Sequence, residues 1–124
     1  MSDVFIGTDI VSIPRLEKTI NSTHGDKFTN RIFTENEINY CINKVNSIIH
    51  FAGRFAAKEA ITKALLSSEK IDSISMKSIE IISGKNRKPE VFLHISSKLQ
   101  LQCKVSISHT DEYAIAFALL EILE

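Results

Sequence analysis

The sequence lacks the features that mark linkers, membrane spans and secretion signals. It has only 4 glycines and 2 prolines in 124 residues, and no segment is rich enough in Gly, Pro or Ser to predict a disordered tail. No apolar run approaches the roughly 20 residues of a membrane span, and Asp3 lies where a signal peptide carries basic residues. We therefore expect a single domain over residues 1–124, located in the cytoplasm and not in a membrane.

The chain also has no excess of either charge, and its two cysteines are isolated. Lys plus Arg and Asp plus Glu each total 15, so no net field directs the chain to nucleic acid. Cys41 and Cys103 form no CxxC pair, which favours buried, reduced thiols. No catalytic-triad motif, Gly-rich phosphate loop or zinc spacing is present, and those enzyme classes are excluded.

Hydrophobic periodicity predicts a strand and a helix at the start of the chain. The segment Val4–Val11 is apolar on both sides, so we expect a strand that is buried on both faces. Ser12 can cap the following helix, which accepts Pro14 in its first turn. The polar segment 21–27 contains a glycine and is expected to be a loop.

Two more helices are predicted in the middle of the chain. Thr34 and Glu37 have the spacing of a capping box, which begins a helix. The apolar stripe of this helix is expected to pack inward and consists of Ile38, Cys41, Ile42 and Val45. The next segment, Ile48–Leu66, is apolar nearly all the way round, so we expect it to be the central, buried helix.

The second half of the chain has the pattern of strands and turns. Residues 79–82 and 91–95 are expected to form a hairpin with a basic tip, followed by a short helix over residues 97–102. Residues 104–123 alternate in two runs around a turn at Thr110 and predict a closing antiparallel hairpin. Because helices and strands do not alternate regularly, the predicted class is α+β with a largely antiparallel sheet around the central helix.

Three charged residues are candidates for chemistry. Glu59 lies on an otherwise apolar side of the central helix, with Lys63 one turn later, and Asp9 lies near the end of the first strand. Spacing alone is compatible with an ordinary helix pair worth about 0.2–0.5 kcal/mol, and with an aspartate that only caps a turn. Together they are the set that Mg²⁺ uses with substrate phosphates, and both interpretations are open at this point. His109, at a strand end, is equally compatible with a core-edge histidine.

Four segments, in order, resemble those of the holo-[acyl-carrier-protein] synthases. They are IGTDIV, RIFTENE, FAGRFAAKEAITKAL and VSISHTDEYA, and the similarity covers nearly the whole chain. The resemblance implies an α+β fold of the 4′-phosphopantetheinyl transferase type, assembled as a homotrimer with active sites between subunits. It implies an enzyme that moves the 4′-phosphopantetheine arm of coenzyme A to a serine of acyl carrier protein and releases adenosine 3′,5′-bisphosphate in fatty acid biosynthesis.

The resemblance also assigns roles to residues of this chain. Asp9 and Glu59 match the Mg²⁺ ligands, with Glu59 or a metal-bound water as the proton acceptor, and Lys63 matches a phosphate-binding and catalytic lysine. The segments that line the nucleotide end of coenzyme A in the family contain Arg54, Lys88, Pro89, Ser108 and His109. Arg15 and Lys18 match the surface that docks acyl carrier protein, although a solvated helix face explains them equally well.

The chain departs from the family pattern at two places. Ser12 stands where an acidic residue is common, so coordination of the metal rests on fewer protein ligands. The segment LSSEKID, which begins at Leu66, replaces a glycine-rich turn, and a backbone approach to the substrate has to be rebuilt there. Two alternatives follow: a binding module that has lost turnover, and a different Mg²⁺ phosphotransferase or pyrophosphatase that uses the same carboxylates.

Overall fold

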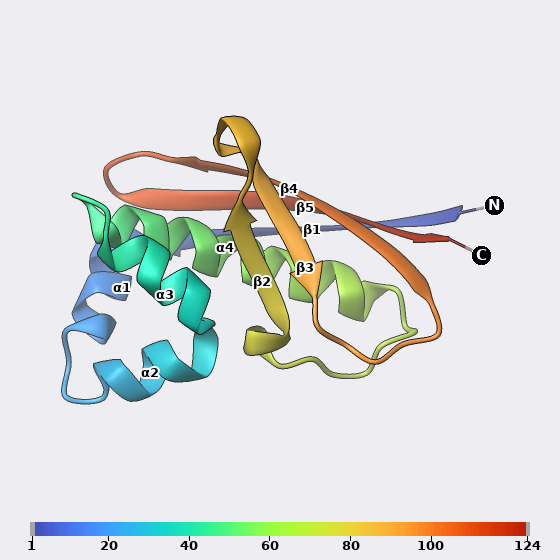
Figure 1. Cartoon of the computed structure of the whole chain (residues 1–124), viewed down its shortest axis with the longest axis horizontal. Coiled ribbons are helices and arrows are strands. Elements are labelled where there is room, and N and C mark those ends of the chain that lie inside the picture. Colours follow the sequence, from blue (N-terminus) through green and yellow to red (C-terminus); the bar gives the residue numbers. More distant parts are fainter. Residues whose placement is uncertain (1, 124) are drawn as a thin grey trace.

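Two antiparallel sheets are arranged around one long helix, α4 (Figure 1). The computed structural model describes residues 2–123. Its elements, in chain order, are β1 (Ser2–Ser12), α1 (Ile13–Ile20), α2 (Gly25–Ile32), α3 (Glu35–Ile42), α4 (Ser47–Ser67), η1 (Met76–Ser78), β2 (Ile79–Ser83), η2 (Lys85–Arg87), β3 (Pro89–Leu93), β4 (Gln100–His109) and β5 (Tyr113–Leu123). The predicted α+β class with antiparallel pairing is confirmed.

The larger sheet has the order β1-β5-β4 and the smaller is the hairpin β2-β3. In the larger sheet β5 is the central strand and pairs along its length with both neighbours. The predicted closing hairpin is confirmed: the Thr110 hydroxyl accepts hydrogen bonds from the backbone of Glu112 at 3.2 Å and Tyr113 at 3.0 Å. This turn holds the ends of β4 and β5 together.

Small side chains let α4 lie directly on the larger sheet. Alanines occupy the buried positions on both sides of the contact: Ala56, Ala57, Ala60 and Ala64 on α4, and Ala114, Ala116 and Ala118 on β5. A side chain at Gly7 of β1 would clash with the backbone of Ala60, so the absence of a Cβ at Gly7 permits this close approach. The carboxyl-terminal half of α4 is thereby brought against the β1 backbone. The prediction of a central, buried helix is confirmed.

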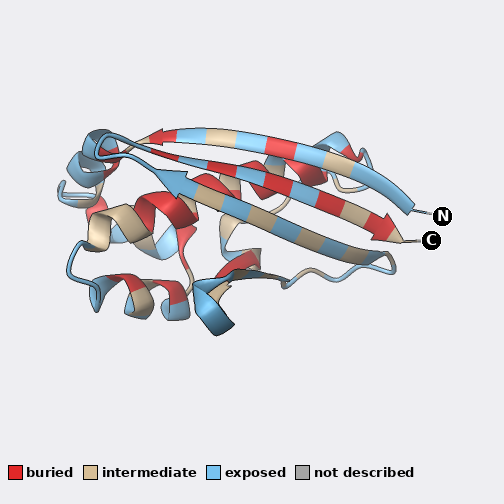
Figure 2. Cartoon of the chain, turned by 90° about the horizontal axis from the view of Figure 1, so that it is seen from above, coloured by how far each residue is buried: buried red, intermediate tan, exposed pale blue. Residues whose placement is uncertain are grey.

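The larger sheet is buried on only one face, which corrects the expectation for β1 (Figure 2). Side chains alternate along a strand, and every second residue of β1 and β5 points away from α4. The exposed apolar residues on that side are Val4, Ile6, Ile10, Tyr113, Ile115, Phe117 and Leu119. We call this surface the outer face. No part of residues 2–123 covers this face, although it is as apolar as a surface that is normally buried.

Three local predictions are wrong. The segment 21–27 is not all loop, because α2 begins at Gly25 and runs to Ile32. Residues 97–102 form no helix, and β4 begins at Gln100. Helix α3 ends at Ile42, so Ile42 and Val45 are 59% and 109% exposed and do not pack inward. No helix among residues 2–123 has the length and apolar character needed to cross a bilayer.

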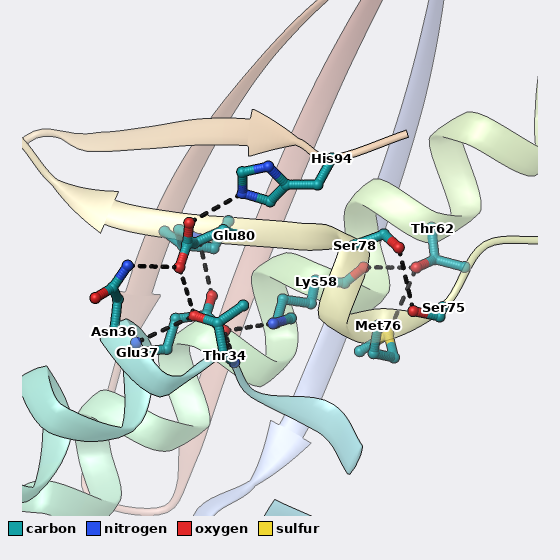
Figure 3. A network of polar contacts seen from close by, with 11 residues as sticks. Thr34, Asn36, Glu37, Lys58, Thr62, Ser75, Met76, Ser78, Glu80 and His94 are labelled. Atoms are coloured by element: carbon teal, nitrogen blue, oxygen red, sulfur yellow. Dashed lines mark hydrogen bonds and ion pairs between the residues drawn. The ribbon is translucent and has the colours of Figure 1, made fainter. Parts of the chain in front are cut away.

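A buried ion pair ties α3, α4 and β2 together (Figure 3). Glu37 and Lys58 are both fully buried and bonded to each other. The other carboxylate oxygen of Glu37 accepts the backbone N–H of Ile81 at 2.8 Å. The predicted capping box is present too, since Glu37 also accepts the backbone N–H of Thr34 at 2.9 Å. One carboxylate thus caps a helix, pairs with a lysine and anchors a strand.

Beside this pair, Glu80 of β2 contacts polar groups from two other segments, the start of α3 and the residue after β3 (Figure 3). Its carboxylate accepts the Thr34 hydroxyl at 2.6 Å and the Asn36 amide at 3.3 Å, and it contacts the ring of His94 at 3.0 Å. Burial works to raise the pKa of Glu80, but these hydrogen bonds outweigh it and lower the pKa. The network links β2 to the start of α3 and to the residue that follows β3.

Candidate functional site

Asp9 and Lys63 meet at the boundary between β1 and α4. The ammonium group of Lys63 donates hydrogen bonds to the Asp9 carboxylate and to the backbone oxygen of Thr8, both at 3.0 Å. Among the ion pairs formed by residues 2–123, none joins Lys63 to Glu59. The ordinary pair expected within the helix is therefore not made. Nor does Asp9 cap α1, because the side chain of Ser12 accepts the N–H of Arg15 at 3.4 Å.

Glu59 lies beside Asp9 in a partly buried position. Burial raises the pKa of Glu59, the negative charge of Asp9 raises it further, and Lys63 opposes both effects. Asp9, Ser12 and Glu59 line one pocket of about 270 Å³ between β1, α1, α2 and α4. Two carboxylates that repel each other in one pocket form a donor set that a divalent cation stabilises.

The number of carboxylates suits Mg²⁺ better than a cation for which the protein has to supply most of the ligands. Among residues 2–123 no group of three or more His, Cys, Asp and Glu converges on one point. Mg²⁺ is typically held by one or two carboxylates, with waters and substrate phosphates completing its octahedron. Asp9 and Glu59 satisfy that requirement, and Ser12 leaves room where a third acid would stand.

The same pocket has an apolar wall that the sequence pattern did not reveal. Leu16, Phe28 and Phe55 line it, and the rings of Phe28 and Phe55 meet edge to face at 5.7 Å. Arg15 lies at its rim on α1, and Lys18 is exposed on the same helix. Phe28 was missed because α2 was not predicted. The spacing of Phe28 and Ile32 at i and i+4 is the only local signal for that helix.

A second pocket, of about 550 Å³, lies on another side of α4 against β2, β3 and β4. Arg54 forms its inner wall and is only 6% exposed. Its guanidinium stacks on the ring of Tyr40 at 4.0 Å and donates to the hydroxyl of Ser83 at 3.2 Å. The Nε of Arg54 is buried and has no hydrogen-bond partner among residues 2–123. We call this the basic pocket.

The permanently charged residues that line the basic pocket are all positive. Its lining includes Arg54, Arg87, His50 and His109, and no aspartate or glutamate. Burial lowers the pKa of His50, and the positive charges of Arg54, Lys44 and His109 lower it further. The hydrogen bond with Ser83 is the main cause of a lowered pKa at Tyr40, with Arg54 and Lys44 contributing. The two arginines therefore give the pocket a positive electrostatic potential.

The structure divides the predicted nucleotide-binding residues. Arg54, Pro89 and His109 line the basic pocket, and Lys88 lines an adjoining groove together with Pro89. Ser108 lines neither; it is exposed on the outer face, in register with Ile115. His109 is also exposed, and its ring contacts the backbone oxygen of Thr110 at 3.3 Å.

The pocket lined by Asp9, Ser12 and Glu59, which we call the acidic pocket, shares no lining residue with the basic pocket. On one chain, Asp9, Glu59 and Lys63 are therefore brought together, while Arg54 and His109 are held on a different surface.

The turn after α4 is rebuilt without glycine. Glu69 takes a left-handed conformation with φ 61°, which glycine usually supplies. The hydroxyl of Ser68 donates to the oxygen of Leu65 at 2.6 Å and accepts the N–H of Lys70 at 3.2 Å. The side chain of Ser68 thus stabilises a turn that contains no glycine.

The fold and the two pockets define an α+β protein that combines a carboxylate pair suited to Mg²⁺ with a separate pocket for an anionic group. Comparison with known proteins narrows this class. Residues 5–118 match the model of the 4′-phosphopantetheinyl transferase superfamily, and the chain belongs to that superfamily and, within it, to the holo-[acyl-carrier-protein] synthases.

The relatives cover the whole chain. A holo-[acyl-carrier-protein] synthase of Chlamydia pneumoniae is 45% identical over 123 residues, which span 96% of this chain and 98% of the relative. A holo-(acyl-carrier-protein) synthase from Bacillus anthracis, solved in complex with CoA (3′,5′-ADP), is 36% identical with a TM-score of 0.75 and 98% coverage of both chains. The ACPS-CoA complex of Chronobacterium ammoniagenes, at 23% identity, shares the fold with a TM-score of 0.83 over 98% of this chain and 99% of that one.

Proposed function

We propose that this protein transfers the 4′-phosphopantetheine group of coenzyme A to a serine of apo acyl carrier protein and releases adenosine 3′,5′-bisphosphate. The observation that carries the proposal is the convergence of Asp9, Glu59 and Lys63, distant in sequence, on one edge of α4. Relatives named holo-[acyl-carrier-protein] synthase support it, and the one from Bacillus anthracis is described in complex with CoA (3′,5′-ADP).

Asp9 and Glu59 are the residues that hold Mg²⁺ in this proposal. When bound, the metal would neutralise the negative charge of the diphosphate and so make the nucleotide a better leaving group. The geometric support is the shared pocket and the mutual repulsion that raises the pKa of Glu59. Phosphates of coenzyme A and waters would supply the remaining ligands, because no third acidic, histidine or cysteine ligand among residues 2–123 joins these two carboxylates.

Lys63 stabilises the charge that grows on the leaving phosphate oxygen. Its ammonium group lies against β1, held by hydrogen bonds to Thr8 and Asp9, so it stands beside the carboxylates before the substrate arrives. The serine oxygen of the carrier protein bonds to the phosphorus that bears the pantetheine arm, and the bond from that phosphorus to the bridging oxygen breaks in line. The serine proton passes to a basic oxygen in the pocket, for which Glu59 is this chain's own candidate.

Arg15 and Lys18 dock the carrier protein beside the acidic pocket. Both are exposed on α1, and Arg15 stands at the rim of the pocket that contains Asp9. An acidic carrier protein would meet these charges first and place its serine over the pocket. Phe28 and Phe55 offer an apolar wall for its side chains.

We propose further that the chain forms a homotrimer through the outer face. Uncovered, this face exposes Ile6, Ile10 and Phe117 at 60%, 62% and 45%, which is unusual for a surface that water alone solvates. A trimer would also explain why the acidic pocket and the basic pocket lie apart on one chain. A coenzyme A molecule that reaches Asp9 of one copy and Arg54 of another requires two copies side by side.

Mass spectrometry of apo acyl carrier protein, incubated with coenzyme A and this protein with and without Mg²⁺, tests the function. We expect a mass gain of one phosphopantetheine group that requires Mg²⁺ and is abolished by Asp9→Ala or Glu59→Ala while both variants stay folded. Coenzyme A binding without any mass gain would identify a binding module. Release of adenosine 3′,5′-bisphosphate without carrier protein would identify a pyrophosphatase. Full activity in either variant would contradict the metal assignment.

A further inference from the structure

The tip of the β2–β3 hairpin has two consecutive residues in a left-handed backbone conformation. Asn86 has φ 59° and Arg87 has φ 61°. Asparagine tolerates this region because its short polar side chain can bond locally, but arginine does not gain in this way. The tip is held by backbone hydrogen bonds from Gly84 to Lys88 at 2.8 Å and from Lys88 to Lys85 at 3.2 Å. Glycine at position 87 would satisfy this backbone with less strain.

The strained conformation places Arg87 at the rim of the basic pocket. Arg87 lines that pocket together with Arg54, His50 and His109. Among residues 2–123 it forms no ion pair, and the carboxylate of the neighbouring Glu90 is not part of the pocket lining. Arg87 is exposed whereas Arg54 is buried, so the two guanidinium groups stand at the mouth and at the floor of one pocket.

The floor of the basic pocket contains a hydrogen-bond donor without a partner among residues 2–123. The Nε of Arg54 is buried and unbonded, while its other contacts, to Ser83 and Tyr40, hold the guanidinium in place. A buried donor without a partner costs free energy unless a ligand satisfies it. Two arginines facing one space without a carboxylate match a dianion with several acceptor oxygens, such as a phosphate monoester, better than a neutral group.

We propose that Arg87 is a specificity-determining residue that closes the basic pocket over the 3′-phosphate of the coenzyme A nucleotide. This inference rests on the proposed function, because it takes coenzyme A as the substrate. Arg87 selects nucleotides that carry a phosphate monoester on the ribose, and Arg54 binds the same group from below. The strain at position 87 is retained because glycine there would lose this contact.

Titration calorimetry with two small nucleotides tests the inference without catalysis. Adenosine 3′,5′-bisphosphate and adenosine 5′-monophosphate differ only in the 3′-phosphate, and neither contains a diphosphate that needs a metal at Asp9. For Arg87→Gly we expect affinity for the bisphosphate to fall roughly 10- to 50-fold and affinity for the monophosphate to stay within about twofold. The melting temperature should not fall, because glycine relieves the backbone strain.

Two matched variants separate the side chain from the hairpin tip. Lys85→Ala removes a positive charge from the same tip, but Lys85 lines none of the pocket, so both affinities should stay unchanged. Arg87→Lys keeps the charge but loses the planar fork, and we expect an intermediate loss for the bisphosphate alone. Equal loss for both nucleotides in Arg87→Gly, or no loss for either, would overturn the role of Arg87.

The same titrations distinguish a failure of the role of Arg87 from a failure of the proposed function. If the unaltered protein binds coenzyme A and the bisphosphate but Arg87→Gly changes the affinities for the two nucleotides equally, or changes neither, only the inference about Arg87 fails. If the unaltered protein binds neither, the proposed function fails with it.

Discussion

Lys63 is bonded to Asp9, 54 residues away in sequence, and not to Glu59 on its own helix. The consequence is an asymmetric pair of carboxylates, one neutralised by a lysine and one partly desolvated. A cation bound at Asp9 would repel the ammonium of Lys63, and in the proposed reaction this would free Lys63 for a phosphate oxygen. The resting contact and the proposed catalytic contact of Lys63 are thus alternatives at one position.

Glu59→Gln is expected to stabilise the metal-free protein at neutral pH. The folded-state pKa of Glu59 is raised, so its contribution to stability is complete below the ordinary value of 4.5 and is lost as pH rises through the raised value. Glutamine removes that loss. We expect the melting temperature to rise by roughly 1–3 °C at neutral pH, a small effect because solvent partly screens the group.

Thermal unfolding at a series of pH values measures this effect, with Glu17→Gln as the control. Glu17 is exposed on α1 and away from Asp9, so its variant should follow the unaltered protein at every pH. A gain for Glu59→Gln that persists below pH 4.5 would show that charge is not its cause.

Local sequence patterns predicted those elements whose signals lie within one element. The capping box at Thr34 and the apolar helix that contains Glu59 follow from spacings of three and four residues, and both are confirmed. The partner of Lys63 could not be predicted in this way, because β1 and α4 are distant in sequence and are brought together by tertiary packing, with a close approach at Gly7. The apolar run Val4–Val11 indicated burial on both faces, but one chain covers a single face.

Glu37 is a second residue whose tertiary contacts could not be predicted from local spacing. The spacing of Thr34 and Glu37 predicted a helix cap, but the pairing with Lys58 and the bond to Ile81 depend on tertiary packing. The helix α2 was missed because its 8 residues contain a glycine and few apolar positions. Phe28, and with it the apolar wall of the acidic pocket, was lost from the prediction for that reason.

Arg15→Glu is expected to raise the Michaelis constant for acyl carrier protein at least tenfold and to leave that for coenzyme A nearly unchanged. The change places a negative charge at the rim of the pocket, where an acidic partner approaches. The difference should be larger at low salt, because screening weakens exposed charges. Steady-state kinetics at two salt concentrations measure it. Lys98→Glu, an equal charge change in the loop before β4, is the control, and equal effects on both substrates in Arg15→Glu would remove the docking role.

Lys58→Met is expected to cost about 3–5 kcal/mol of unfolding free energy, because it leaves the buried carboxylate of Glu37 without its cation. Lys63→Met breaks an ion pair whose lysine is 55% exposed, and there we expect about 1 kcal/mol or less. Urea unfolding at one fixed protein concentration compares the two. A similar cost for both variants would mean that the Glu37 pair does not lock α3 and β2 onto α4.

Mixing two inactive variants tests whether the active site is formed between two copies of the chain. If each site joins Asp9 of one copy to Arg54 of another, Asp9→Asn and Arg54→Ala are each inactive alone, but mixed trimers contain some sites with both residues intact. Random mixing in equal amounts should restore about a quarter of the normal activity, after a denaturation and refolding step that exchanges subunits. Phe117→Glu places a charge on the outer face and should yield monomers by sedimentation, with no recovery on mixing. Inactive mixtures that are nevertheless trimeric would show that coenzyme A contacts only one chain.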